Sequence, residues 1–137
     1  MDPLERLREK IAGFPGYVGD LDRRRSDELV RSYLGEALTE LAARCGELSP
    51  ELQQRVDALL LRVGFADPKS FAVHRVVSNI PTPPHDGGEV AQDDVAAVDV
   101  ADRAPEVDAA SIARYLDDVT ATLDGREAAM RAAATKP

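Results

Sequence analysis

Apolar residues recur every three or four positions through most of the first eighty residues, the spacing of one face of an α-helix. Leu4, Leu7 and Ile11 share such a face. They follow Asp2, a residue that commonly caps helix N-termini, and a proline suited to the first helical position. The pattern predicts a first helix, ended by the glycine- and proline-rich turn at residues 13–19.

The longest predicted helix starts at Asp20 or Asp22 and runs to about Arg44, with Gly46 as its stop. Its apolar positions form a stripe wider than a coiled-coil seam, so we expect it to pack against two neighbours. That stripe consists of two rows: Val30, Leu34, Leu38 and Ala42, and Leu29, Tyr33, Ala37, Leu41 and Cys45.

A third helix is predicted from Ser49-Pro50 to Gly64, again with a capping residue before a proline. Residues 69–79 start with a similar signal, although their β-branched content also suits a strand. We expect a helix there, because a single strand would have no partner elsewhere in the chain.

The pattern changes after Ile80. Residues 81–108 are rich in proline, glycine and aspartate, and their valines look too isolated to anchor a core, so we expect a disordered, acidic linker. A last amphipathic helix then starts near Asp108 or Ser111. An isolated helix of about 14 residues is marginal in water, so it must dock on its own bundle, exchange into a second copy or bind a partner.

The predicted fold is therefore all-α: a bundle of three to four short helices plus a C-terminal helix, joined by a disordered linker. The expected divisions are residues 1–80 for the bundle, 81–108 for the linker and 109–137 for the last helix and tail.

Charge is unevenly distributed along the chain, whose formal net charge is -8. Residues 1–80 carry 12 Lys and Arg against 13 Asp and Glu, whereas residues 81–137 carry 5 against 12. An acidic surface repels phosphate backbones and anionic lipid, so nucleic-acid and membrane partners are not favoured. The chain has a single cysteine and no apolar run near the roughly 20 residues that a membrane helix needs, and we expect a cytoplasmic protein.

One helix carries a concentration of arginines: Arg23, Arg24, Arg25 and Arg31. They could contact an anion such as nucleic-acid phosphate. Acidic residues three or four positions away from them, however, predict ion pairs along the same helix, which would neutralise the group.

Signals for catalysis, metals and cofactors are lacking in the sequence. His74 and His85 are the only histidines and neither has a nearby partner with metal-ligand spacing. The free thiol of Cys45 lies on an apolar row and suits a core position. We therefore expect no enzyme, no cofactor and no metal site.

The stretch from Gly16-Tyr17 to Leu41 resembles a group of small bacterial proteins of unknown function, which have a Gly-Tyr turn followed by a helix with an Arg-Arg-x-x-Asp motif. The resemblance covers about the first third of the chain. It implies a helical bundle without a known activity, in which Tyr17, Arg24 and Asp27 fix the turn against the bundle.

The function we expect is a non-enzymatic, cytoplasmic protein–protein interaction module, with another protein or a second copy as partner. A small nucleic-acid-binding regulator that uses the arginine-rich helix is the alternative. The expected interaction residues lie on a second face of the third helix and on the last helix: Leu61, Phe65, Ile112, Tyr115, Leu116, Val119 and Leu123.

Overall fold

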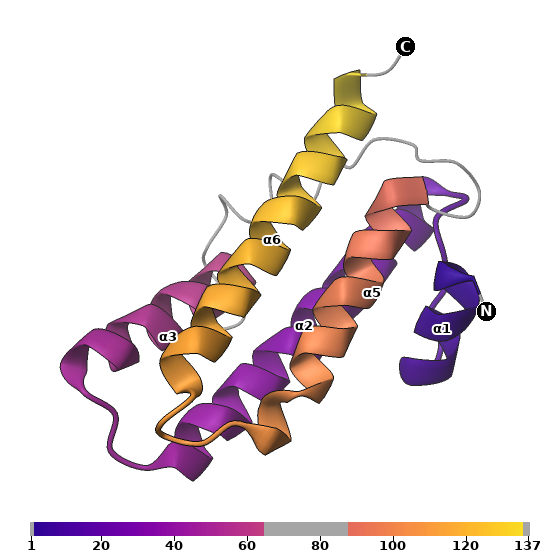
Figure 1. Ribbon diagram of the computed structural model, residues 1–137. Helices are drawn as coiled ribbons and strands as arrows, with labels where there is room; N and C mark the ends of the chain where they lie inside the picture. The colour runs from indigo at the N-terminus through magenta and orange to yellow at the C-terminus, as the bar shows by residue number, and fades with distance from the viewer. Residues whose placement is uncertain (1, 65–87, 136–137) are drawn as a thin grey trace.

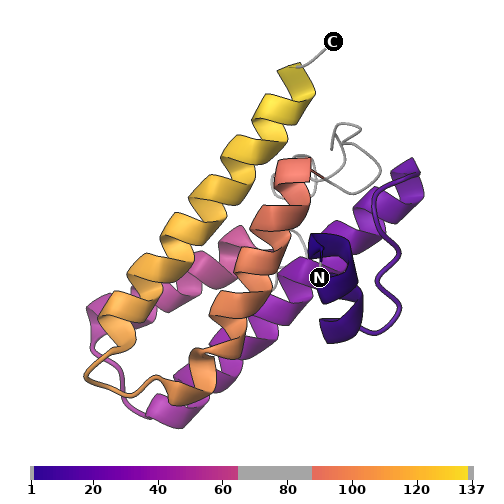
Figure 2. The same ribbon diagram turned by 45° about the vertical axis from the view of Figure 1, so that its right-hand side comes forward.

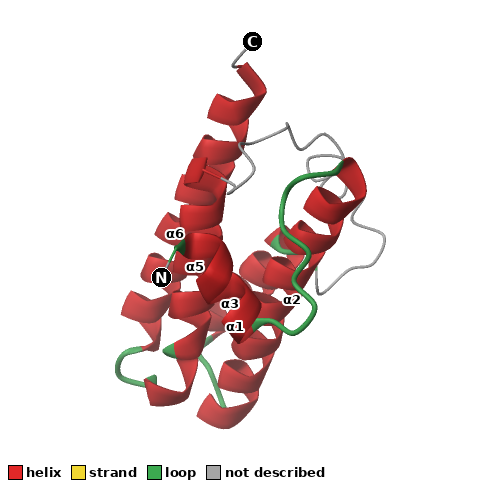
Figure 3. Ribbon diagram, turned by 90° about the vertical axis from the view of Figure 1, so that its right-hand side faces the viewer, coloured by secondary structure: helices red, strands yellow, loops and turns green. Residues whose placement is uncertain are grey.

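The computed structural model describes residues 2–64 and 88–135, and within them every regular element is helical, which confirms the all-α prediction. Figure 3 shows these helices joined by loops. The elements are α1 (Pro3–Lys10), α2 (Asp20–Cys45), α3 (Pro50–Arg62), α5 (Gly88–Asp102), a 3-10 turn (Ala104–Glu106) and α6 (Ile112–Thr135).

Local signals set several helix ends where the sequence predicts them. The Asp2 carboxylate accepts a hydrogen bond from the Glu5 amide at 2.8 Å, and Ser49 caps α3 in the same way. Gly46 ends α2 with a positive φ of 71°, a conformation that side-chain-bearing residues rarely adopt.

Helix α5 lies at the centre of the arrangement and packs against α1, α2 and α6 (Figure 1). Helix α3 contacts both α2 and α6. The view in Figure 2 shows α2, α5 and α6 as the three long elements, with α3 behind α6 and α1 beside α5.

The core has two clusters. The first joins α2, α3, α5 and the N-terminal half of α6, with Leu38, Val56 and Leu116 at its interior. The second joins α1, the following turn, the N-terminal half of α2, α5 and the C-terminal half of α6. Along α6, Leu123 belongs to the first cluster, whereas Ala129 and Met130 belong to the second.

The prediction of a disordered linker over residues 81–108 is wrong for its larger part, because residues 88–102 form α5. Val90, Val98 and Val100 are buried. The valines looked isolated because the positions that complete their helical stripe are occupied by alanine and by Asp94, which are poor hydrophobic markers in a sequence. Residues 81–87 and the predicted helix at 69–79 lie outside the described residues.

The last predicted helix is present and docks on its own chain, sharing the first cluster with α2 and α3. Asp108 and Ser111 form the start that the sequence predicts, with Asp108 Oδ1 accepting from the Ser111 amide at 2.9 Å. The helix continues through Gly125 to Thr135.

The charge asymmetry has a structural explanation. Acidic residues of α5 and α6 pair with basic residues of α1 and α3, so the two halves of the chain are complementary surfaces rather than a neutral bundle with an acidic tether. The pairs are Arg6–Asp99 at 2.7 Å, Lys10–Asp102 at 3.1 Å, Arg55–Asp117 at 2.5 Å, Arg62–Asp124 at 2.6 Å and Arg62–Glu127 at 3.1 Å. Such exposed pairs contribute at most about 1 kcal/mol each.

Candidate functional site

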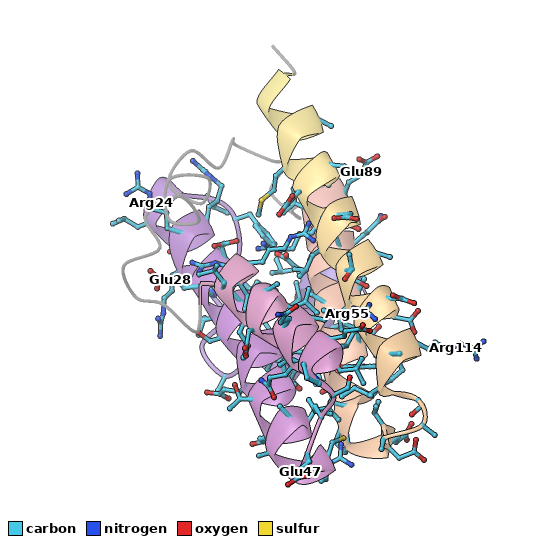
Figure 4. The ribbon with its side chains drawn as sticks, turned by 90° about the vertical axis from the view of Figure 1, so that its left-hand side faces the viewer. Arg24, Glu28, Glu47, Arg55, Glu89 and Arg114 are labelled. Carbon is cyan, nitrogen blue, oxygen red and sulfur yellow. The ribbon has the colours of Figure 1, made fainter. Side chains whose placement is uncertain are left out.

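The four arginines that the sequence singles out in α2 (Arg23, Arg24, Arg25 and Arg31) do not form a common anion-binding surface. Arg23 is buried and donates to the carbonyl oxygens of Tyr17 and Val18, both at 3.3 Å. Arg31 is also buried, whereas Arg25 is exposed and pairs with Glu28 at 3.3 Å. Arg24 is exposed at the N-terminal end of α2 and points away from the bundle (Figure 4).

The expected interaction residues of α6 lie inside the protein. All five belong to the first core cluster and are buried: Ile112, Tyr115, Leu116, Val119 and Leu123. They hold α6 on its own chain and present no face to a partner. Leu61 of α3 remains 45% exposed, and Phe65 lies outside the described residues.

The interior instead contains a cluster of charged and polar side chains that the sequence did not predict. We call Tyr17, Asp27, Arg31, Asp94 and Arg126 the buried ionic network. They come from the turn before α2, from α2 itself, from α5 and from α6. Four separate parts of the chain therefore meet at one polar point within an aliphatic core.

Arg126 is the centre of this network. Its Nε donates to Asp94 Oδ1 at 2.6 Å, and its Nη2 donates to Asp27 Oδ1. The second oxygen of Asp94 accepts from the Tyr17 hydroxyl at 2.5 Å. The second oxygen of Asp27 accepts from Arg31 Nε at 2.7 Å, one helical turn along α2. The two carboxylates thus balance the two guanidinium groups.

Burial controls the protonation of these groups. Loss of water raises the pKa of Asp94, although the charge of Arg126 and the donated hydrogen bonds oppose this shift. Burial and the neighbouring Asp94 carboxylate raise the pKa of Tyr17, which stays a neutral donor. Burial lowers the pKa of Arg126, but Asp27 and Asp94 outweigh it and raise that pKa overall. The arginine therefore stays charged.

Arg31 has one donor more than its neighbours satisfy. Its Nη1 donates to the Val63 carbonyl oxygen at 3.0 Å, at the end of α3. Its Nη2 is buried and has no hydrogen-bond partner among residues 2–64 and 88–135. The network is otherwise occupied by its own members, which suits a role in holding helices in place rather than in chemistry.

Hydrogen bonds to this network and to side chains of α2 hold the turn at residues 16–19 in place. Besides the Tyr17 and Arg23 contacts, Ser26 Oγ donates to the Gly16 carbonyl oxygen at 2.6 Å. Gly16 has a φ of 92°, and a Cβ there would approach Arg8 Nη2 to 3.3 Å, so the turn requires glycine. We call residues 16–19 the pinned turn.

Two aliphatic side chains next to this fixed backbone face water. Val18 is 62% exposed and Leu21, in the first turn of α2, is 79% exposed. Large apolar side chains that stand out from a rigid backbone are a common feature of contact surfaces, although single ones occur on any protein. Sequence reasoning missed them because it treated residues 13–19 only as the turn that ends the first helix.

Part of the network carries a recognisable local signal. Asp27 and Arg31 are four positions apart on α2, a spacing that predicts an ion pair, and the pair is present. Tyr17 and Asp27 were also expected to fix the turn against the bundle. Asp94 and Arg126 carry no comparable signal, because their partners are up to 99 positions away.

No group of side chains within residues 2–64 and 88–135 has the arrangement of a metal site. Cys45 is a free, partly buried thiol, and His74 and His85 lie outside the described residues. Among the helices described, none is long and apolar enough to cross a membrane.

Comparisons with known proteins add no relative: no protein-family model, no curated protein and no solved structure matches this chain.

Proposed function

We propose that the protein is a non-enzymatic, cytoplasmic protein-binding module whose contact surface includes the pinned turn and the first turn of α2. The observation that supports this proposal is the exposure of Val18 and Leu21 on a backbone that three side chains hold in place.

Exposed apolar side chains on a backbone that is already fixed favour binding. Association costs free energy for every segment that must become ordered, so a loop already fixed in the free protein keeps more of its contact energy. Burial of a leucine side chain contributes about 1.5–3 kcal/mol, and Leu21 presents most of its surface for such burial. We therefore assign Leu21 as the anchor and Val18 as its neighbour.

The partner we propose is a different protein with an apolar groove, rather than a second copy of this chain. The chain carries a formal net charge of -8, so two copies repel each other. The arginine side chains of α2 are not needed for the contact, since Arg23 and Arg31 are occupied inside the protein. This separates the proposal from binding of nucleic acid.

The test is capture of partners on full-length protein from a native lysate, with and without nuclease, followed by binding measurements with the purified partner. We expect a protein that survives nuclease, and a loss of affinity of at least tenfold for Val18→Ser with Leu21→Ser. Leu61→Ser is the matched control, because it removes an exposed leucine at a different place and should leave affinity within twofold.

Two results would contradict the proposal. Recovery that depends on nucleic acid would favour the regulator class instead. A partner whose affinity is unchanged in the double serine variant would place the contact surface elsewhere.

A further inference from the structure

Helix α6 is attached to the rest of the protein in two different ways. Before Gly125, large aliphatic side chains such as Ile112, Leu116 and Val119 are fully buried in the first core cluster. After Gly125, the buried side chains among those described are Arg126, Ala129 and Met130. The first half of α6 is therefore held by the burial of large aliphatic side chains, whereas the second half combines the ionic contacts of Arg126 with apolar contacts of Ala129 and Met130.

Gly125 stands at the boundary of these two halves. It is exposed in the interior of a long helix, where glycine is less favourable than alanine. A Cβ at this position would lie 3.6 Å from Asp93 Oδ1, which is an ordinary contact distance. Packing within this chain therefore does not require a glycine at position 125. A bend of the helix at this position would explain why it is a glycine.

The ionic part of the attachment beyond Gly125 is of a kind that is easily reversed. The attraction between buried charges is largely cancelled by the loss of their hydration, so a buried ion pair adds little net stability compared with a hydrated, open state. Arg126 can exchange Asp27 and Asp94 for water at small cost. A leucine in the same position would lose its burial on opening and gain no hydrogen bonds in return.

We propose that residues 126–135 form a releasable strap that bends at Gly125 and is held closed by the buried ionic network. Opening withdraws Arg126 from Asp27 and Asp94 and uncovers the α5 residues Val90 and Ala91, which belong to the second cluster with Met130. The aliphatic half of α6 stays docked. This inference does not depend on the proposed function, because it concerns the isolated protein and involves no partner.

Amide hydrogen exchange on the full-length protein tests the strap. A released segment of this length is too short to stay helical in water, so opening at Gly125 also exposes its own amides. Opening therefore gives one shared protection factor for the amides of residues 129–135, at least 100-fold below that of residues 116–123. Ordinary fraying of a helix end instead gives protection that rises gradually from Thr135 inward. A gradual profile without a step at Gly125 would overturn the proposal.

Two substitutions test the hinge. Gly125→Ala should slow exchange of the strap amides about fivefold, the factor that corresponds to the difference in helix propensity between glycine and alanine. Ala121→Gly, an exposed change of the opposite sense before the hinge, should leave the strap amides within twofold. If Ala121→Gly speeds exchange of the strap amides by the same factor by which Gly125→Ala slows it, Gly125 is not a hinge.

The latch is tested by Arg126→Met, which leaves Asp94 without its counter-ion. Strap exchange should rise at least tenfold while residues 116–123 are unchanged; an equal rise throughout α6 would show that Arg126 holds the whole fold. If that variant does not fold, Tyr17→Phe with Asp94→Leu and Arg126→Met replaces the ionic latch by apolar contacts. Its strap should exchange no faster than the wild type, and faster exchange would contradict a marginal latch.

Discussion

The Nε of Arg126 donates to Asp94 Oδ1 at 2.6 Å in the interior of the protein, although the two residues are 32 positions apart and come from different helices. Asp94 and Arg126 are 1% and 5% exposed. Because a buried charge without a partner is strongly unfavourable, this contact permits one alignment of α5 against α6 and excludes helix slippage. The pair specifies the fold more than it stabilises it.

The hydroxyl of Tyr17 should contribute more to stability than the hydroxyl of Tyr33, although both donate to carboxylates. Tyr17 donates to buried Asp94, whereas Tyr33 donates to exposed Asp102. A hydrogen bond to a buried charged group contributes about 1.5–3 kcal/mol, so Tyr17→Phe should lower the free energy of unfolding by about that amount. Tyr33→Phe should cost below about 1 kcal/mol, because water replaces the lost donor. Urea unfolding of both variants measures the difference, and equal losses would show that the network is hydrated.

Helix α5 should behave as core rather than as a tether. Val98 is 1% exposed, so Val98→Ala should reduce the free energy of unfolding by about 1–2 kcal/mol through lost burial of its methyl groups. Val95 is only partly buried and serves as the control, with a smaller loss for Val95→Ala. Urea denaturation decides between them. An unchanged free energy of unfolding in Val98→Ala would instead support the solvated linker that the composition of this segment suggested.

The difference between what the sequence predicts and what it misses is one of distance along the chain. The start of α1 at Asp2, the start of α3 at Ser49 and the end of α2 at Gly46 depend on residues within four positions, and they were predictable. So was the Asp27–Arg31 pair.

The role of α5 depends instead on which surfaces meet. Its buried stripe contains alanines and Asp94, which in the sequence are typical of a solvated segment. Their burial is explained only by the partners of Asp94, which are Arg126 of α6 and Tyr17 of the turn. A charge is predicted to be buried only when its counter-charge is known, and here the counter-charge follows 32 positions later. The same reasoning explains why the acidic C-terminal half resembled a tail: its partners are the basic residues of α1 and α3.

The fold should lose stability in alkaline solution, and Tyr115 should account for a defined share of that loss. This side chain donates to the Val100 carbonyl oxygen at 2.6 Å, and burial raises the pKa of Tyr115 from 10.0 to about 12. The folded protein therefore keeps a proton that the unfolded chain releases above pH 10. Stability is fully present below pH 10 and falls as pH rises towards 12, by at most about 1.4 kcal/mol per pH unit for one such group.

Urea unfolding between pH 9 and pH 11.5 measures this dependence, and absorbance of tyrosinate near 295 nm reports ionisation directly. Tyr115→Phe should reduce the slope of the decline by the share of one group, since phenylalanine has no proton to lose, while burial also raises the pKa of Tyr17 and of Tyr33. An unchanged slope in that variant would assign the alkaline loss to the remaining tyrosines.

The start of α6 should be sensitive to acid. Hydrogen bonds from the Ser111 side chain and backbone lower the pKa of Asp108, a fully exposed group. Its folded-state pKa lies below the unfolded value, so its contribution is present above pH 3.8 and is lost as pH falls through the folded-state pKa. Protection of the Ala110 and Ser111 amides, measured relative to the intrinsic exchange rate at each pH, should therefore fall first on acidification, before the aliphatic part of α6 opens. Asp108→Asn keeps a capping side chain that does not titrate, so its exchange at these two amides should not depend on pH beyond the intrinsic rate. The same loss of protection in the asparagine variant would show that another carboxylate controls the start of this helix.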